Sequence, residues 1–110
     1  MRRFLIPNPF GKRGRKAHRT GVRQVEKQLR KKKLRIRKEV HISTPNGKKK
    51  RRFIDIVGID RFENFVELWQ VGWSNKDGRP VKRERDAIDD IEDELKRNVN
   101  FWSLGFRKRK

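Results

Sequence analysis

The segment FIDIVGIDRFENFVELWQVG, residues 53–72, holds two runs that are rich in β-branched and aromatic residues. A short polar turn, RFEN at residues 61–64, separates them. The two runs predict antiparallel strands at about residues 53–59 and 65–71, joined as a β-hairpin. Burying a lone carboxylate costs several kcal/mol unless it is paired or bound to a metal. The strands nevertheless carry three polar side chains: Asp55, Glu67 and Gln70.

Helical periodicity marks one segment on each side of the hairpin. The first, at about residues 15–33, has a narrow apolar stripe, with His18 one turn earlier on the same side. The stripe consists of Val22, Val25 and Leu29. The second helix is expected at residues 81–95, because Pro80 suits a first turn and an apolar stripe follows it. Glu84 interrupts that stripe, and a salt bridge to Arg85 or to a basic residue on the sheet is favoured over a role in orienting Arg83 or a catalytic cation.

Two more strands complete the expected fold. LRIRKEVHI, residues 34–42, alternates in polarity, so its apolar residues should share one face of a half-buried strand. These are Leu34, Ile36, Val40 and Ile42. NFWSLGF, residues 100–106, is the last expected strand. The order α-β-β-β-α-β predicts an α/β domain at residues 15–106 with a central mixed sheet flanked by helices, a basic N-terminal arm at 1–14 and a basic tail at 107–110.

The distribution of charge points to a polyanionic partner. Residues 1–52 carry 21 of the 33 Lys and Arg residues but only two of the 14 acidic residues, so this half holds the whole net charge of +19. Neutralising phosphates releases condensed counterions, which makes nucleic acid the favoured partner over an anionic membrane or a basic surface that only confers solubility. The residues expected to contact it are His18, Arg19, Lys48, Lys49, Lys50, Arg51, Arg52, Lys76 and Arg83.

Other classes of protein find little support in the composition. The chain has no Cys, which excludes disulfides and Cys-ligated zinc and fits a reducing compartment. Its longest apolar runs are shorter than the roughly 18 residues of a membrane span, and the basic N-terminus lacks the core of a signal peptide. We therefore expect a cytoplasmic protein without a membrane partner.

The inward acids predict a metal site. Asp55 and Glu67 lie on neighbouring predicted strands, which are about 4.8 Å apart in a sheet, so their carboxylates are expected to share one ion. Mg²⁺ or Mn²⁺ suits one or two carboxylates completed by water and phosphate. Glu26, at the edge of the first helical stripe, is the third expected ligand, and its alternative is a salt bridge to Arg23 or Arg30.

The order of elements, with a helix Glu, a strand Asp and an acid on the next strand, resembles the PD-(D/E)xK nuclease fold. The runs FIDIVGID…VELWQVG and GRPVKRERDAIDDIE are similar to DNase domains of bacterial polymorphic toxins, and Holliday junction resolvases share the fold. The resemblance implies Asp55 and Glu67 as metal ligands and Glu26 as the helix acid. Where the family has Lys two residues after the acid, this chain has Trp69, which leaves Gln70, or a cation such as Lys82 further along, for that task.

These observations predict a Mg²⁺-dependent DNA endonuclease with little sequence preference, in which RNA is the alternative substrate. A toxin domain would need an acidic immunity protein, whereas a stand-alone junction nuclease would fit a homodimer. The alternative is a non-catalytic nucleic-acid-binding protein on a nuclease-like fold.

Overall fold

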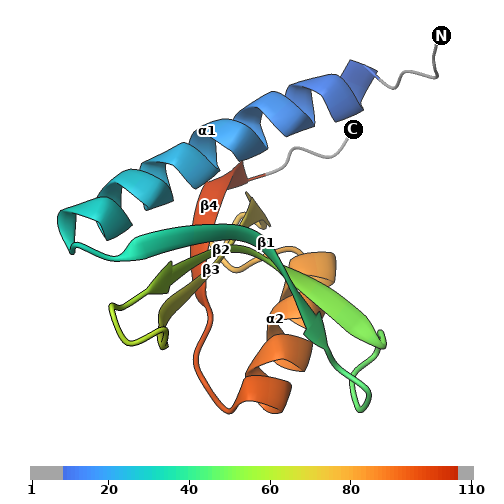
Figure 1. The fold of residues 1–110 in the computed structure, drawn as a ribbon. Coiled ribbons are helices and arrows are strands. Elements are labelled where there is room, and N and C mark those ends of the chain that lie inside the picture. The colour runs from blue at the N-terminus through green and yellow to red at the C-terminus, as the bar shows by residue number, and fades with distance from the viewer. Residues whose placement is uncertain (1–8, 107–110) are drawn as a thin grey trace, which may run out of the picture.

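The structure, a computed structural model, describes residues 9–106 of the chain, so the expected tail at 107–110 and most of the expected arm lie outside the described residues. It is an α/β fold with a four-stranded mixed sheet and one helix on each face (Figure 1). The sequence predicts the order of the elements, and the structure confirms it. In chain order they are α1 (Pro9–Lys31), β1 (Arg35–Ser43), β2 (Arg51–Ile59), β3 (Phe65–Ser74), α2 (Lys82–Leu95) and β4 (Asn100–Phe106).

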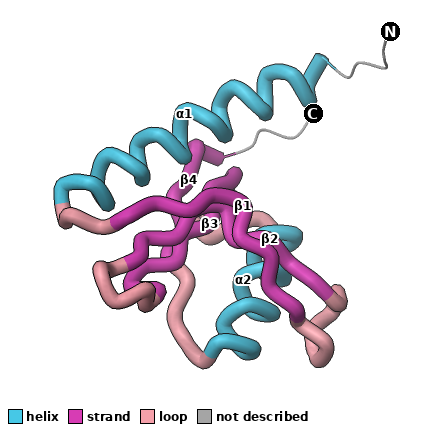
Figure 2. The backbone as a smooth tube through the Cα atoms, in the orientation of Figure 1, coloured by secondary structure: helices cyan, strands magenta, loops and turns pink. Residues whose placement is uncertain are grey.

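The strands lie in the order β1-β2-β3-β4. β1 with β2, and β2 with β3, are antiparallel hairpins, whereas β3 and β4 are parallel. A parallel pair needs a long crossover, which α2 supplies across one face of the sheet. The loops between the elements lie at the ends of the sheet, and the β1–β2 loop lies beside α2 (Figure 2).

Each face of the sheet packs one helix through its own apolar cluster. On the α1 face the buried residues are Val22, Val25, Leu29, Ile56 and Val71. On the α2 face they are Ile54, Val57, Ile59, Leu68, Ile88, Ile91 and Val99. α1 can approach β3 closely because residue 21 is Gly: a Cβ there would lie 2.7 Å from Val71 Cγ1. Residues 9–14, expected as irregular arm, instead form the start of α1, for which Pro9 is a suitable first residue.

Halfway along the β1–β2 hairpin, the apolar side chains change from one face of the sheet to the other. Leu34 and Ile36 pack on the α1 face, whereas Val40 and Ile42 pack on the α2 face. The prediction that these four residues share a face is therefore wrong. Glu39 lies between the two pairs with a φ of 52°, a left-handed conformation that is costly for a non-glycine residue. This backbone kink reverses the alternation of side chains along the strand.

β2 makes the same change of face at Asp55. Ile54 belongs to the α2 cluster and Ile56 to the α1 cluster, although strict alternation would place both on one face. In the register of the hairpin, Lys38 pairs with Ile56 and Val40 with Ile54, so Asp55 stands opposite the kinked Glu39. Asp55 therefore lies at the residue of β2 where the side chains change from one face of the sheet to the other. Within residues 9–106, neither helix is long and apolar enough to cross a membrane.

Candidate functional site

Asp55 lies where β2 and β3 separate. The paired residues of these strands run from Ile59 and Phe65 to Ile56 and Trp69, and beyond this point β2 pairs with β1 while β3 pairs with β4. Side chains replace the backbone ladder at the next step. The Asp55 N–H donates to Gln70 Oε1 at 2.7 Å, and the Val71 N–H donates to Asp55 Oδ2 at 2.8 Å. Asp55 and Gln70, two of the three polar residues of the hairpin, thus bridge β2 and β3 at the point where the backbone pairing ends.

α1 brings His18 to this opening. His18 Nε2 lies 3.3 Å from Asp55 Oδ2, and the Asp55 side chain is 20% exposed. The hydrogen bond to Asp55 raises the pKa of His18 above its usual value, against the effect of its burial, and the negative charges of Asp55, Glu84 and Glu39 act in the same direction. The geometry places Nε2 of the imidazole to donate a hydrogen bond to the Asp55 carboxylate.

α2 brings Glu84 to the same place. A Cβ on residue 72 would lie 2.6 Å from Glu84 Oε2, so Glu84 can lie against β3 only because that residue is Gly72. Burial raises the pKa of Glu84, and the negative charge of Asp55 raises it further. Arg85, one of the expected partners of Glu84, donates instead to the carbonyl oxygen of Pro80. Among the described residues no hydrogen bond or ion pair engages the Glu84 carboxylate, which makes it an unsatisfied acid beside a second acid.

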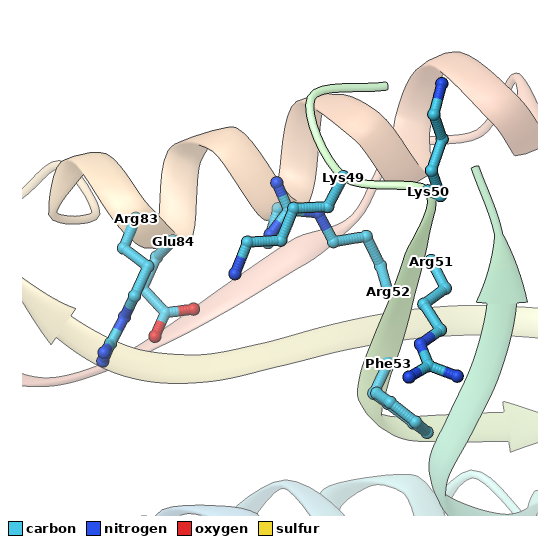
Figure 3. Close-up of a pocket in the computed structure, with 8 residues that line it drawn as sticks. Lys49, Lys50, Arg51, Arg52, Phe53, Arg83 and Glu84 are labelled. Atoms are coloured by element: carbon cyan, nitrogen blue, oxygen red, sulfur yellow. The ribbon is translucent and has the colours of Figure 1, made fainter. Parts of the chain in front are cut away.

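A cleft with a volume of about 560 Å³ opens between β2 and α2 (Figure 3). Glu84 is the one acid among the side chains that line it. Arg52 reaches across from β2 towards α2, whereas Arg51 and Phe53 point away from α2. The cationic lining residues are Lys49, Lys50, Arg51, Arg52 and Arg83. The cleft therefore places a cationic wall beside Glu84, whose pKa is raised in part by the negative charge of Asp55.

Asp90 of α2 holds the basic β1–β2 loop against the helix. Its carboxylate accepts the backbone N–H groups of Lys48 at 3.0 Å and Lys49 at 3.2 Å. It also accepts from Arg52 Nε and forms an ion pair with Arg52 Nη2, both at 2.8 Å. The Asp90 side chain is 7% exposed and the Arg52 side chain 9%. Burial opposes ionisation of Asp90, but the two backbone bonds and the Arg52 charge lower its pKa below the usual value. The sequence analysis did not identify this residue, which orders the cationic wall.

The structure does not bring Glu67 to Asp55. Glu67 pairs across the hairpin with Gly58, three residues from Asp55, which corresponds to about 10 Å along a strand. Its carboxylate accepts from Lys32 Nζ at 2.6 Å and from Trp69 Nε1 at 2.9 Å. Burial acts to raise the pKa of Glu67, but these two hydrogen bonds lower it. An acid held by a cation and an indole in this way has a structural explanation.

Glu26 and Lys82 are also engaged elsewhere. Glu26 forms ion pairs with Arg30 at 2.7 Å and Lys38 at 2.9 Å, so its predicted alternative, a salt bridge to Arg30, is what the structure shows. Lys82 Nζ pairs with Asp86 at 2.8 Å. Hydrogen bonds from Lys82 and then from Lys48 lower the pKa of Asp86 to about 2.

The remaining predicted nucleic-acid contacts divide between two places. Lys49, Lys50, Arg51, Arg52 and Arg83 line the cleft. Arg19 and Lys76 are exposed residues outside that lining, on α1 and on the β3–α2 loop, and Lys48 pairs with Asp86 at 3.0 Å. The structure therefore brings together five of the nine predicted contacts, with His18 bound to Asp55.

The donor atoms of this site suit a magnesium ion. Asp55 and Glu84 offer carboxylate oxygens, the ligands that Mg²⁺ prefers, and Mg²⁺ commonly binds through one or two carboxylates, several waters and substrate phosphate. In the described part of the chain no three His, Cys, Asp or Glu side chains are grouped to hold a metal ion. The negative charge of Asp55 nevertheless raises the pKa of Glu84, and a divalent cation bound at Glu84 would offset that repulsion.

Searches of family models, curated proteins and solved structures find no match to this chain. The assignment of function therefore depends on the site itself.

The link between His18 and Asp55 predicts a pH effect. The folded-state pKa of His18 is above the usual value, so protonated His18 stabilises the fold below the unfolded pKa, and this contribution is lost as pH rises through the folded pKa. In an NMR titration, His18 should titrate above a free histidine in the wild type and at lower pH in Asp55→Asn. An unchanged His18 titration in that variant would show that Asp55 is not the cause of the shift.

Proposed function

We propose that the protein is a metal-dependent endonuclease that hydrolyses phosphodiester bonds in DNA with little sequence preference. One observation carries the proposal: Glu84 is the one acid that lines a cleft whose other charged side chains are cationic, and Asp55 lies near enough for its negative charge to raise the pKa of Glu84. Cations bind a phosphate backbone, and neighbouring acids bind a divalent ion beside it. A protein that only bound nucleic acid would gain nothing from half-buried acids beside a cationic cleft.

The cationic wall accounts for binding. Lys49 comes from the loop before β2 and Arg83 from the first turn of α2, so these two cations approach a ligand from both sides of the cleft. The N-terminus of α2 adds its own preference for anions. Contacts of this kind position a nucleic acid through its phosphates and carry no information about base sequence. Weak sequence preference follows.

The acids and their neighbours account for catalysis. Asp55 and Glu84 would hold Mg²⁺ or Mn²⁺, and such an ion, when bound, supplies a hydroxide nucleophile and stabilises the charge on the phosphate. The Val71 N–H and His18 fix one oxygen of Asp55, and the other oxygen has no partner among the described residues, so it could bind an ion. Gly72 leaves the space that Glu84 needs. Arg83, the cleft residue next to Glu84, is placed to neutralise charge at the phosphate.

The order of elements and the position of Asp55 on β2 support membership of the PD-(D/E)xK superfamily as part of this proposal. The third motif departs from that family. Gln70, not Glu67, lies at Asp55, and the residue two positions after Gln70 is Gly72 where the family has Lys. Glu84 lies over Gly72, so α2 supplies the second acid and Arg83 the cation in the proposed site.

Plasmid nicking tests the proposal directly. Supercoiled plasmid should be converted to open-circular DNA in the presence of Mg²⁺ or Mn²⁺ and remain intact in EDTA, because the acids alone provide no nucleophile. Calorimetry should detect binding of Mg²⁺ at millimolar concentrations, weakened in Glu84→Gln. Absence of both nicking and metal binding would contradict the proposal and favour a non-catalytic nucleic-acid-binding protein.

That second candidate is favoured by one observation, the lack of a three-ligand metal cluster among residues 9–106. Within the first candidate, a toxin domain paired with an acidic immunity protein and a stand-alone junction nuclease acting as a homodimer remain separate predictions. Comparing cleavage of linear duplex, flaps, four-way junctions and RNA distinguishes them.

A further inference from the structure

Phe53 is an exposed aromatic residue at the edge of the cationic cleft. Its residue surface is 53% exposed, although it lies within a strand between buried Arg52 and buried Ile54. The core thus makes little use of this ring. Leaving a large apolar side chain exposed forgoes the stabilisation that its burial would contribute, which raises the question of what it contacts.

The ring of Phe53 is held in place on one side. The His41 imidazole of β1 lies opposite it in the hairpin register, with ring centroids 5.3 Å apart and planes at 68°, an edge-to-face arrangement. This contact fixes the orientation of the Phe53 side chain and leaves part of its surface open. Arg51 points from β2 in the same direction (Figure 3). The two side chains form a ledge with an aromatic surface and an adjacent cation.

The ledge lies next to the proposed catalytic site. Phe53 and Asp55 are two residues apart on β2, a separation of about 7 Å along a strand. Both flank Ile54, which packs towards α2, and Asp55 meets His18 of α1 on the other side. A group stacked on Phe53 would therefore lie close to Asp55.

We propose that Phe53 stacks on an unpaired base of a single-stranded nucleic acid whose backbone follows the cationic cleft. This inference rests on the proposed function and names its substrate class. Proteins that bind single strands combine a positive groove with aromatic rings on which bases stack. The bases of an intact duplex are already stacked and paired, so a ring at the cleft edge has no free base to contact there. Single strands, or single-stranded segments beside a junction, match both features of the cleft.

The test compares two strands that have the same phosphates. A fluorescein-labelled strand of about 12 nucleotides, and the same strand with consecutive abasic sites, are titrated with protein in EDTA and followed by anisotropy. The wild type should bind the strand with bases at least about 5-fold more tightly, which corresponds to one stacked base. Phe53→Leu should abolish this ratio, and Phe53→Trp should retain it. Phe62→Leu, which changes an even more exposed Phe in the β2–β3 turn, is the matched control and should behave as wild type.

Equal binding of the two strands by the wild type would overturn the inference, as would a ratio that Phe53→Leu leaves unchanged. Tighter binding to duplex than to single strand, lost in Phe53→Leu, would also overturn it by assigning Phe53 to an inserted wedge. The measurement contains no divalent metal and is independent of cleavage. A protein that discriminates between the strands but does not nick plasmid refutes the proposed nuclease and leaves this inference standing, whereas one that nicks without discriminating refutes only this inference.

Discussion

Asp55→Asn should lower the rate of Mg²⁺-dependent nicking by at least about 100-fold, because a catalytic metal ion contributes several kcal/mol and this change removes a charged ligand. The fold should survive, since the Asn oxygen can still accept the Val71 N–H. Binding of DNA in EDTA should be as tight as in the wild type or tighter, because one negative charge leaves the cleft. Plasmid nicking and anisotropy measure the two effects separately.

Glu67→Gln is the matched control. Glu67 is the acid on the neighbouring strand β3. It forms an ion pair with Lys32 and does not lie at Asp55. The stability of the variant should change by no more than about 1 kcal/mol, as for other partly exposed ion pairs, and nicking should persist at the wild-type rate. If Glu67→Gln were as inactive as Asp55→Asn, Glu67 would belong to the site and the assignment of Glu84 would be wrong. Full activity in Asp55→Asn would refute the metal mechanism altogether.

The position of Gln70 opposite Asp55 could have been predicted from the sequence. If residues 61–64 form the turn, Asp60 stands opposite Phe65, and counting back along both strands places Asp55 opposite Gln70. The observed register from Gly58 to Ile56 agrees with this count, despite the irregularity at Ile59. Composition identified the hairpin and its polar residues, but only the register decides which of them meet.

The contribution of Glu84 was visible in the sequence as an acid on an apolar helical stripe, but its environment was not. That depends on Gly72, whose missing side chain leaves room on β3, and on the crossover that returns α2 across the sheet. The change of face at Glu39 cannot be seen in the sequence of β1, because the apolar residues before and after Glu39 keep the same two-residue spacing. Local periodicity therefore predicts the elements well and their relative rotation poorly.

Asp90 was overlooked because acids are frequent on α2 and nothing in the sequence distinguishes it from exposed Asp89. Its function depends on the β1–β2 loop, which is some forty residues earlier in the chain and reaches α2 only in the folded sheet. Gly47 makes this contact possible, because a Cβ there would lie 2.4 Å from Asp90 Cγ. A long-range contact of this kind requires the tertiary structure.

Asp90→Ala should therefore be the most destabilising single change to a polar residue of this site. It leaves the buried guanidinium of Arg52 and two backbone N–H groups without an acceptor, and removing one partner of a buried pair costs about 3–5 kcal/mol. For a domain of this size the melting temperature should fall by about 10 °C or more. Asp89→Ala is the matched control and should change stability by less than about 0.5 kcal/mol, since that side chain is exposed.

The dependence of this effect on pH identifies its cause. The folded-state pKa of Asp90 is below its usual value, so ionised Asp90 stabilises the fold above the unfolded pKa, and this contribution is lost as pH falls through the folded pKa. The difference in unfolding free energy between wild type and Asp90→Ala should accordingly be largest near neutral pH and smaller below about pH 4. Asp90→Asn keeps an oxygen for the loop N–H groups but loses the charge, so its stability should lie between the two. Urea unfolding at several pH values measures all three proteins, and a difference that is constant with pH would attribute the loss to packing instead of to the carboxylate that organises the cationic wall.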